Sequence, residues 1–128
     1  MSKICTDLEQ SRKLVELGLA TTTADMYFEP FVGFRTEPSE IKVGDIRYAH
    51  PRSVPAWSLS ALLDLMPKIK ASAPILVKAL LEEKYFCHYQ GIGTFKEVYT
   101  TTFHEEPTDA AFEMVVWLLE NGYIKPIK

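Results

Sequence analysis

Side chains that could carry out catalysis or bind a metal ion are few and widely spaced. The three histidines are His50, His88 and His104, and only Cys87 lies beside one of them. Adjacent residues of a strand point to opposite faces of its sheet, so Cys87 and His88 would not hold one metal ion together. A cysteine with a distant histidine is the minimum for a thiol nucleophile, but this pattern is common in cytosolic proteins. We therefore expect Cys87 to be a buried structural thiol.

The carboxylates and glycines do not indicate acid–base catalysis or a phosphate-binding loop. Glu82 with Glu83 and Glu105 with Glu106 are expected in solvated turns, where carboxyl groups titrate normally and are poor general acids or bases. The Gly-Ile-Gly sequence at 91–93 predicts a turn, because no helix pattern follows it as a phosphate loop would require. The sequence thus predicts no catalytic residue, no metal site and no cofactor, and an enzyme is the less favoured hypothesis.

The composition is that of an ordinary globular protein, with 47% hydrophobic and 24% charged residues. A length of 128 residues fits one α+β domain, residues 1–128. The net charge of −3 argues against broad contact with a phosphate backbone, so nucleic-acid binding is not expected. The first ten residues lack the apolar stretch of a signal peptide, and no run approaches the roughly 18 apolar residues of a membrane span. Two cysteines cannot build a disulfide framework, and these features together predict a cytoplasmic protein without membrane contact.

Three segments have the periodic apolar pattern of amphipathic helices, at residues 6–18, 58–66 and 108–120. Each has residues at its ends that favour starting and stopping a helix. The predicted start and stop signals are, in order, Thr6 with Glu9 as a capping box and Gly18; Ser58 and Pro67; Thr108 and Asn121 with Gly122. The positions that define the apolar faces are Leu8, Ser11 and Val15; Leu59, Leu62, Leu63 and Met66; Ala111, Met114, Val115 and Leu118.

Strands are predicted in the two regions between these helices. Residues 26–57 are interrupted by prolines and rich in aromatic residues, and short strands are expected at 26–28, 32–35 and 45–48. The segments 75–81, 85–89 and 94–103 favour a three-stranded antiparallel meander; a helix over 75–83, begun by Pro74, is the alternative for the first of them. We therefore expect an α+β fold in two layers, a mainly antiparallel sheet with the three helices packed on one face.

Two stretches resemble segments of uncharacterised small proteins encoded in bacterial prophages and other mobile elements. They are Val-Pro-Ala-Trp-Ser-Leu-Ser-Ala-Leu-Leu-Asp-Leu-Met-Pro at 54–67 and Ala-Ala-Phe-Glu-Met-Val-Val-Trp-Leu-Leu-Glu-Asn-Gly-Tyr-Ile at 110–124, together with the opening helix at 6–18. The resemblance implies a prophage setting. Its motifs are mostly apolar, so it supplies no catalytic residues.

One tryptophan does not fit the pattern of a simple buried helix face. Trp117 lies opposite the apolar stripe of the last helix, on the polar side with Glu113 and Glu120. Either a loop of the same chain covers Trp117 or a partner does, because aromatic residues are enriched at interface hot spots. These three residues are our candidate partner-binding site, with a symmetric homodimer as one form of the contact. The predicted function is protein–protein binding or self-association. A small-ligand-binding protein or enzyme using the aromatic region 26–57, and a nucleic-acid-associated regulator, are the alternatives.

Overall fold

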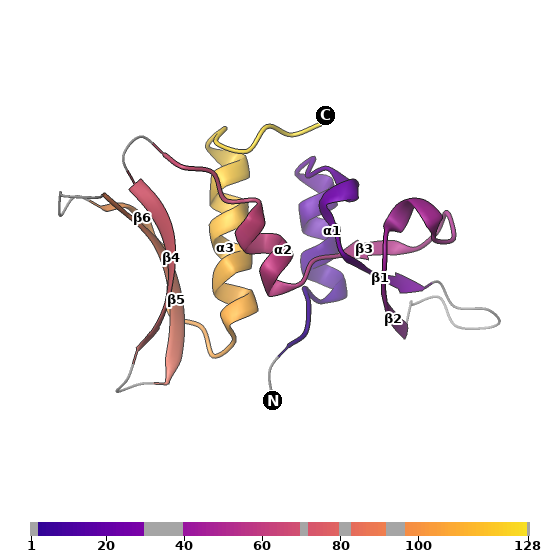
Figure 1. The fold of residues 1–128 in the computed structure, drawn as a ribbon, viewed down its shortest axis with the longest axis horizontal. Coiled ribbons are helices and arrows are strands. Elements are labelled where there is room, and N and C mark those ends of the chain that lie inside the picture. Colours follow the sequence, from indigo (N-terminus) through magenta and orange to yellow (C-terminus); the bar gives the residue numbers. More distant parts are fainter. Residues whose placement is uncertain (1–2, 30–39, 70–71, 80–82, 92–96, 128) are drawn as a thin grey trace.

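Three helices lie between two antiparallel sheets in the computed structural model, which describes residues 3–29, 40–69, 72–79, 83–91 and 97–127 (Figure 1). The helices are α1 (Leu8–Glu16), α2 (Leu59–Asp64) and α3 (Pro107–Glu120). The N-terminal sheet has the order β2-β1-β3 and consists of β1 (Met26–Glu29), β2 (Glu40–Val43) and β3 (Val54–Ala56). The C-terminal sheet has the order β4-β5-β6 and consists of β4 (Ser72–Ala79), β5 (Lys84–Gly91) and β6 (Glu97–Thr100).

The predicted α+β class with antiparallel strand pairing is confirmed, and the strands are divided between two sheets rather than joined in one. The division arises because β3 leads into α2, which packs against α3, so the chain has crossed the helix layer before β4 begins. The C-terminal sheet contacts α3, and the N-terminal sheet contacts α1 through β3. Helices therefore cover one face of each sheet (Figure 1).

The N-terminal sheet differs from its prediction in two strands. The strand expected at 26–28 is present as β1, whereas the one expected at 32–35 lies outside the described residues. The strand expected at 45–48 is wrong: Ile46–Tyr48 form a turn of 3-10 helix, η2. Its cause is Asp45, whose Oδ1 accepts a hydrogen bond from the Arg47 backbone N–H at 2.9 Å and thereby favours a local turn. The strands β2 and β3 were not predicted.

The C-terminal sheet confirms the predicted meander. Residues 72–79 form a strand, β4, so the helix alternative is wrong over these positions; the next three residues lie outside the described ranges. Register pairs Leu76 with Cys87 and Pro74 with Tyr89 between β4 and β5. The third strand ends at Thr100, earlier than predicted, because the chain then turns toward α3; positions 94–96 of the predicted strand lie outside the described residues.

The start of α1 is one residue later than predicted. Asp7, not Thr6, is the N-cap: its Oδ1 accepts from the Gln10 N–H at 2.8 Å, and the Gln10 Oε1 accepts from the Asp7 N–H at 3.0 Å. Thr6 is fully buried, and its hydroxyl accepts from the Trp57 N–H at 3.1 Å. The predicted stop is confirmed, since Gly18 has a φ of +95° and a Cβ there would lie 2.7 Å from that of Pro126.

The other two helices begin with different chemistry. The Ser58 Oγ accepts from the Ala61 N–H at 3.2 Å, which confirms the predicted cap of α2. The predicted Thr108 cap of α3 is wrong, because Pro107 already occupies the first helical position and Thr108 is buried with its hydroxyl directed at the Lys3 carbonyl, 3.3 Å away. Gly122 ends α3 with a φ of +79°. Within the described ranges, none of the helices is long and apolar enough to cross a membrane.

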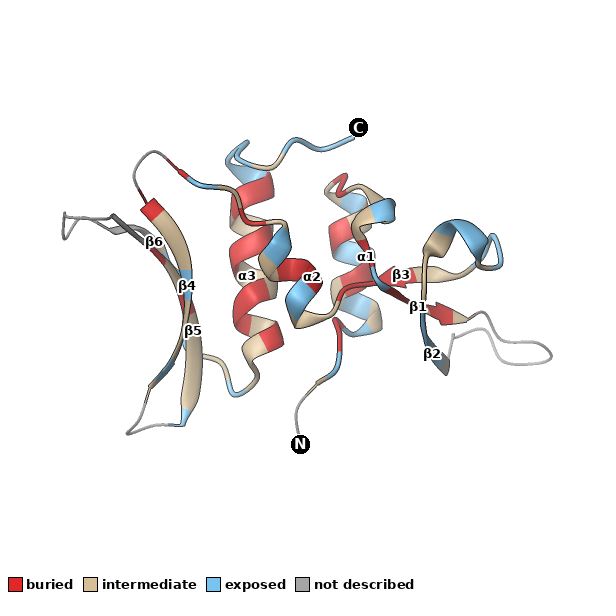
Figure 2. Ribbon diagram, in the orientation of Figure 1, coloured by how far each residue is buried: buried red, intermediate tan, exposed pale blue. Residues whose placement is uncertain are grey.

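The main hydrophobic core lies between the helices and the C-terminal sheet (Figure 2). Its largest fully buried side chains include Trp57 and Tyr89. The remaining members with no exposed surface are Leu14, Leu62, Cys87, Ala110, Ala111, Met114, Val115 and Leu118. A second, smaller cluster beneath the N-terminal sheet consists of Cys5, Met26, Phe28 and Ala56.

Candidate functional site

Trp117, the central residue of the predicted partner site, is stacked between two tyrosines of its own chain. The Tyr99 ring from β6 lies 4.4 Å from the Trp117 ring, centroid to centroid, with 8° between the planes. The Tyr123 ring lies 5.4 Å away on the turn that follows α3, with 19° between the planes. Of the two alternatives for covering Trp117, the structure contains the intramolecular one, so a second copy is not needed to bury this side chain.

Glu113 is the acceptor for a cluster of hydrogen bonds that holds the chain after β6 against α3. Its Oε1 accepts from the Thr102 hydroxyl at 2.7 Å and faces the His104 Nε2 at 2.8 Å, and its Oε2 accepts from the Tyr99 hydroxyl at 3.1 Å. Burial by itself would raise the pKa of the Glu113 carboxyl, but the hydrogen bonds from Thr102, His104 and Tyr99 outweigh it and hold the pKa below its ordinary value. Glu113 therefore acts within the fold. Glu120 is exposed.

The Thr102–His104–Glu113 cluster does not have the geometry of a nucleophile activated by a histidine. In such a triad the hydroxyl and the carboxylate lie on opposite nitrogens of the imidazole ring. Here the Thr102 Oγ1 is 3.2 Å from His104 Nε2, the same nitrogen that faces the Glu113 carboxylate. The Thr102 hydroxyl donates directly to that carboxylate, so the cluster serves to connect β6 and α3.

The remaining sequence candidates are separated from one another. Cys87 is fully buried, as predicted, and burial raises the pKa of its thiol to about 11, which keeps it protonated at neutral pH. Glu105 is exposed, whereas Glu106 lies at the start of α3 and accepts from the Lys3 N–H at 2.9 Å. Over the part of the chain that is described, no three His, Cys, Asp or Glu side chains gather as a metal site would require.

The described aromatic side chains of the region 26–57, the predicted wall of a ligand pocket, lie in different surroundings. Phe28 belongs to the small cluster, Trp57 lies in the main core, and Tyr48 is 87% exposed. These side chains therefore either pack within the protein or project into solvent.

The outer face of the C-terminal sheet carries an apolar surface that sequence analysis did not identify. Residues paired across an antiparallel ladder share a face, so Ile75 and Val77 project with His88 and Phe86 to the side opposite α3. The Phe86 ring lies edge-on to those of His88 at 5.4 Å and Phe103 at 5.3 Å. Ile75 is 39% exposed and Phe103 is 53% exposed. We refer to these five residues as the outer patch.

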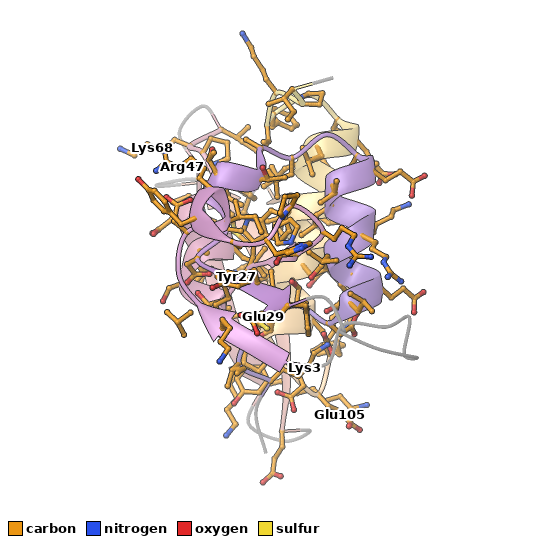
Figure 3. All side chains as sticks on the ribbon, turned by 90° about the vertical axis from the view of Figure 1, so that its right-hand side faces the viewer. Lys3, Tyr27, Glu29, Arg47, Lys68 and Glu105 are labelled. Carbon is orange, nitrogen blue, oxygen red and sulfur yellow. The ribbon has the colours of Figure 1, made fainter. Side chains whose placement is uncertain are left out.

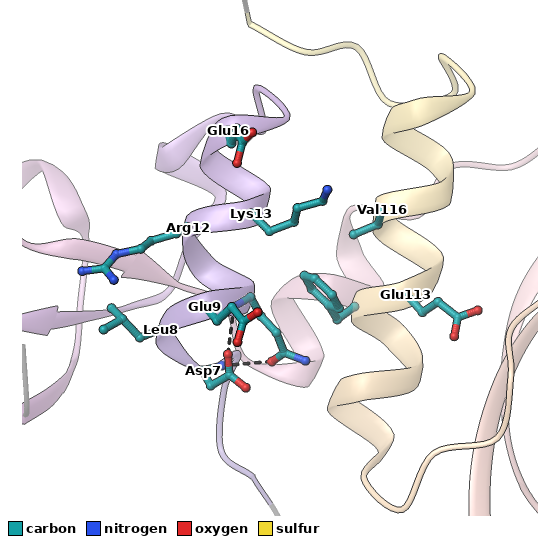
Figure 4. Close-up of a pocket in the computed structure, with 10 residues that line it drawn as sticks. Asp7, Leu8, Glu9, Arg12, Lys13, Glu16, Glu113 and Val116 are labelled. Carbon is teal, nitrogen blue, oxygen red and sulfur yellow. Dashed lines mark hydrogen bonds between the residues drawn. The ribbon is translucent and has the colours of Figure 1, made fainter.

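The second surface feature is a groove of about 970 Å³ between α1 and α3 (Figure 4). Phe112 and Val116 line it from α3, and Glu9, Lys13 and Glu16 line it from α1. Lys13 extends from α1 toward α3, whereas Glu113 points away from α1 (Figure 4). The groove therefore combines an apolar floor with charged walls.

Comparisons with known proteins found no similar chain. No protein-family model, no curated protein and no solved structure matches this chain.

Proposed function

We propose that this chain is a cytoplasmic accessory protein, of the prophage-encoded kind that residues 54–67 and 110–124 resemble, and that it acts by self-association through the outer patch. The observation that carries the proposal is that Ile75, Val77 and Phe86 lie together on the outward face of β4 and β5, while helices cover only the other face of this sheet. In β4, Leu76 faces α3 and its neighbours Ile75 and Val77 face outward. Strands with solvent on one side alternate apolar and polar residues, whereas strands covered on both sides read as continuous apolar runs.

The N-terminal sheet supplies the contrast within the same molecule. There, Met26 and Phe28 face the small cluster, and Tyr27 and Glu29 alternate with them on the other face of β1. Lys42 of β2 pairs with Tyr27 and shares that face. Figure 3, in which this end of the molecule faces the viewer, labels Tyr27 and Glu29 among its side chains. The outer face of β1 and β2 thus carries polar groups beside Tyr27, whereas the outer face of the C-terminal sheet carries Ile75, Val77 and Phe86 next to one another.

A second copy is the cover that fits the outer patch. The patch combines aliphatic and aromatic side chains with one imidazole, so a symmetric contact would bring no carboxylate against a carboxylate although each chain carries a net charge of −3. Two sheets pack face to face at about 10 Å, and a two-fold contact is the commonest symmetry of soluble oligomers. The result would be six layers, with the two C-terminal sheets at the centre, the helices on either side of them and the N-terminal sheets outermost.

The size of the sheet sets the expected strength of this contact. Three strands about 4.8 Å apart and up to about eight residues long give a footprint of about 14 by 26 Å. Projecting side chains enlarge the accessible area, so two copies would bury on the order of 1,000 Å², at the lower limit for a specific interface. We therefore expect a reversible dimer with a dissociation constant in the micromolar range.

Sedimentation equilibrium over a range of concentrations tests the proposal. We expect wild type to shift from monomer to dimer as its concentration rises, and Ile75→Glu to stay a monomer because a carboxylate would be buried against its own copy. Val43→Glu is the matched control, since Val43 is 82% exposed on the N-terminal sheet and should leave the dimer unchanged. A wild-type monomer at every concentration, or a dimer that tolerates Ile75→Glu, contradicts the proposal.

A further inference from the structure

The groove between α1 and α3 is held at both ends by contacts that fix its width. At the lower end, the Lys3 Nζ donates to Asp109 Oδ1 at 2.7 Å, to Gln10 Oε1 at 3.0 Å and to Asp7 Oδ2 at 3.1 Å, so one ammonium joins the starts of the two helices. Burial opposes ionisation of Lys3, but its hydrogen bonds to Asp109 and Asp7 prevail and raise its pKa. The groove is thus formed before any ligand arrives.

The upper end is closed by the segment that follows α3. The Ile127 N–H donates to the Gly18 carbonyl at 2.7 Å, directly after the end of α1. Pro126 lies against Gly18 so closely that a Cβ on this glycine would collide with it. Because α1 spans nine residues, the space between the two closures is about 14 Å long, which corresponds to two to three turns of helix.

The floor of the groove is the part of α3 that other elements leave accessible. Phe112 and Val116 stand one turn apart and are half-buried, and both pack partly against the main core. Residues four apart line the same face of a helix, so Glu120 continues this stripe one turn beyond Val116. The accessible stripe of α3 is thus apolar at Phe112 and Val116 and acidic at Glu120, which suits an amphipathic ligand.

The walls of the groove carry an excess of acidic groups. Glu9 and Glu16 stand on α1 with Lys13 between them (Figure 4), and Glu120 is exposed at the end of α3. The residues that line the groove include four carboxylates, those of Asp7, Glu9, Glu16 and Glu113, and two cations, Arg12 and Lys13. This acidic excess favours a ligand with positive charge, and of the two cations Arg12 points away from α3 (Figure 4).

From this geometry we propose that the groove binds one amphipathic helix of a partner protein, with an apolar ridge directed at Phe112 and Val116 and with Lys and Arg at its flanks. Two neighbouring helices with an apolar floor form a seat for a third, which reads the floor through residues spaced by three and four. The acidic walls select the basic flanks by charge complementarity. This site lies on the opposite side of α3 from the C-terminal sheet, so it is independent of the outer patch.

Two designed peptides of about 14 residues provide the probe, both with leucine at every third or fourth position. One carries Lys and Arg at its flanks and the other carries Glu at the same positions. Fluorescence anisotropy should show saturable binding of the basic peptide and at least about tenfold weaker binding of the acidic one. Binding of the basic peptide should weaken further between about 0.05 M and about 0.5 M salt, because the wall charges are at the surface.

Variants of the groove separate this site from unspecific charge attraction. Val116→Lys should weaken binding of the basic peptide at least about tenfold. Val43→Lys, the same change at an 82% exposed residue of the N-terminal sheet, should not weaken it. Glu9→Gln with Glu16→Gln should weaken binding several-fold and reduce its dependence on salt. Thermal melts establish that each variant is folded, and Ile75→Glu should bind the peptide as wild type does, whatever its oligomeric state. Equal affinity for both peptides, the absence of saturable binding, or equal effects of Val116→Lys and Val43→Lys would overturn the proposal.

Discussion

The two sheets of this protein use their faces differently. The C-terminal sheet packs against α3 through Cys87 and Tyr89, which are fully buried, and its other face carries the outer patch. The N-terminal sheet covers only a small cluster with Met26 and Phe28, and its β2 strand leaves Val43 82% exposed. Stability should therefore reside mainly in the C-terminal sheet with α2 and α3, while the N-terminal sheet is attached to that core by few contacts.

The attachment depends on particular residues of α1 and the segment before it. Leu14 of α1 belongs to the main core, and Leu8 packs against the small cluster, so this helix contacts both. Ahead of the helix, the Thr6 N–H donates to the Trp57 carbonyl at 2.9 Å, and the Thr6 hydroxyl accepts from the Trp57 N–H at 3.1 Å. Changes in the main core, at this connection and in the N-terminal sheet should accordingly have effects of different size.

The largest effect is expected in the main core. Leu118→Ala should lower the free energy of unfolding by about 2–5 kcal/mol, because Leu118 is fully buried and its removal leaves a cavity. Leu62→Ala should cost a similar amount. Met26→Ala in the small cluster should cost less, because its neighbours are fewer and can relax into the space. Urea denaturation measures all three, and a loss at Met26 as large as that at Leu118 would remove the distinction between the two regions.

An intermediate effect is expected at the connection between them. Thr6→Val keeps the shape of the side chain but removes the acceptor of the Trp57 N–H and the partner of the Ser11 hydroxyl at 2.8 Å. Leaving these groups buried without a bond should cost about 1–3 kcal/mol. Thr22→Val is the control, since Thr22 is exposed and should change stability by less than about 0.5 kcal/mol. Thermal or urea melts of the two variants should differ accordingly, and equal melts would mean that Thr6 is not a connection.

The stability of the contact between the C-terminal sheet and α3 depends on pH through Glu113. Its folded pKa lies below the ordinary value, so its stabilising effect is present above the unfolded pKa and is lost as pH falls through the folded one. Glu113→Gln should cost about 1–2 kcal/mol at neutral pH. The difference from wild type should shrink below about pH 4.

The control for this pH dependence is on the same helix. Glu120→Gln changes an exposed carboxylate and should leave the unfolding free energy within about 0.5 kcal/mol of wild type. Urea denaturation at neutral and acidic pH distinguishes the two variants. A difference between Glu113→Gln and wild type that does not vary with pH would show that the ionised carboxylate is not what stabilises the cluster.

The smallest effect on stability is expected at exposed apolar residues of both sheets. Val43→Thr and Ile75→Thr keep a β-branched side chain, so each should change the unfolding free energy of the monomer by less than about 0.5 kcal/mol. They should differ in association: Ile75→Thr weakens the dimer and Val43→Thr does not. Melts at low concentration together with sedimentation separate the two quantities. Equal dimer dissociation constants for the two variants would count against the outer patch.

Sequence patterns predicted the elements that depend on local chemistry. Ser58 caps α2 and Gly18 ends α1 as expected, because both roles are set by neighbouring residues. The error at the start of α1 has a long-range cause. Thr6 and Asp7 are both good N-cap residues, but the Thr6 hydroxyl accepts a hydrogen bond from the Trp57 N–H, 51 residues away, and therefore does not cap the helix. The predicted strand at 45–48 is wrong because the turn that Asp45 stabilises prevails over the β propensity of Ile46 and Tyr48.

The candidate site shows the same limit. Helical periodicity places Trp117 on the polar side of α3, but the Tyr99 ring that covers it comes from β6 and is brought alongside only by the tertiary fold. The outer patch did have a signal in the sequence, the run Ala-Pro-Ile-Leu-Val at 73–77. Its alternation of Ile75 and Val77 was used to predict a strand, whereas the presence of Leu76 between them already indicated that both faces are apolar.

Hydrogen exchange at two protein concentrations tests the central claim most directly, with the two sheets as references for each other. We predict that amides of β4, in residues 72–79, exchange more slowly at a concentration that populates the dimer than at one that does not. Amides of β2, in residues 40–43, should exchange at the same rate in both samples, because the N-terminal sheet stays outside the contact. Exchange in β4 that is independent of concentration, or protection that grows equally in β2, would contradict self-association through the outer patch.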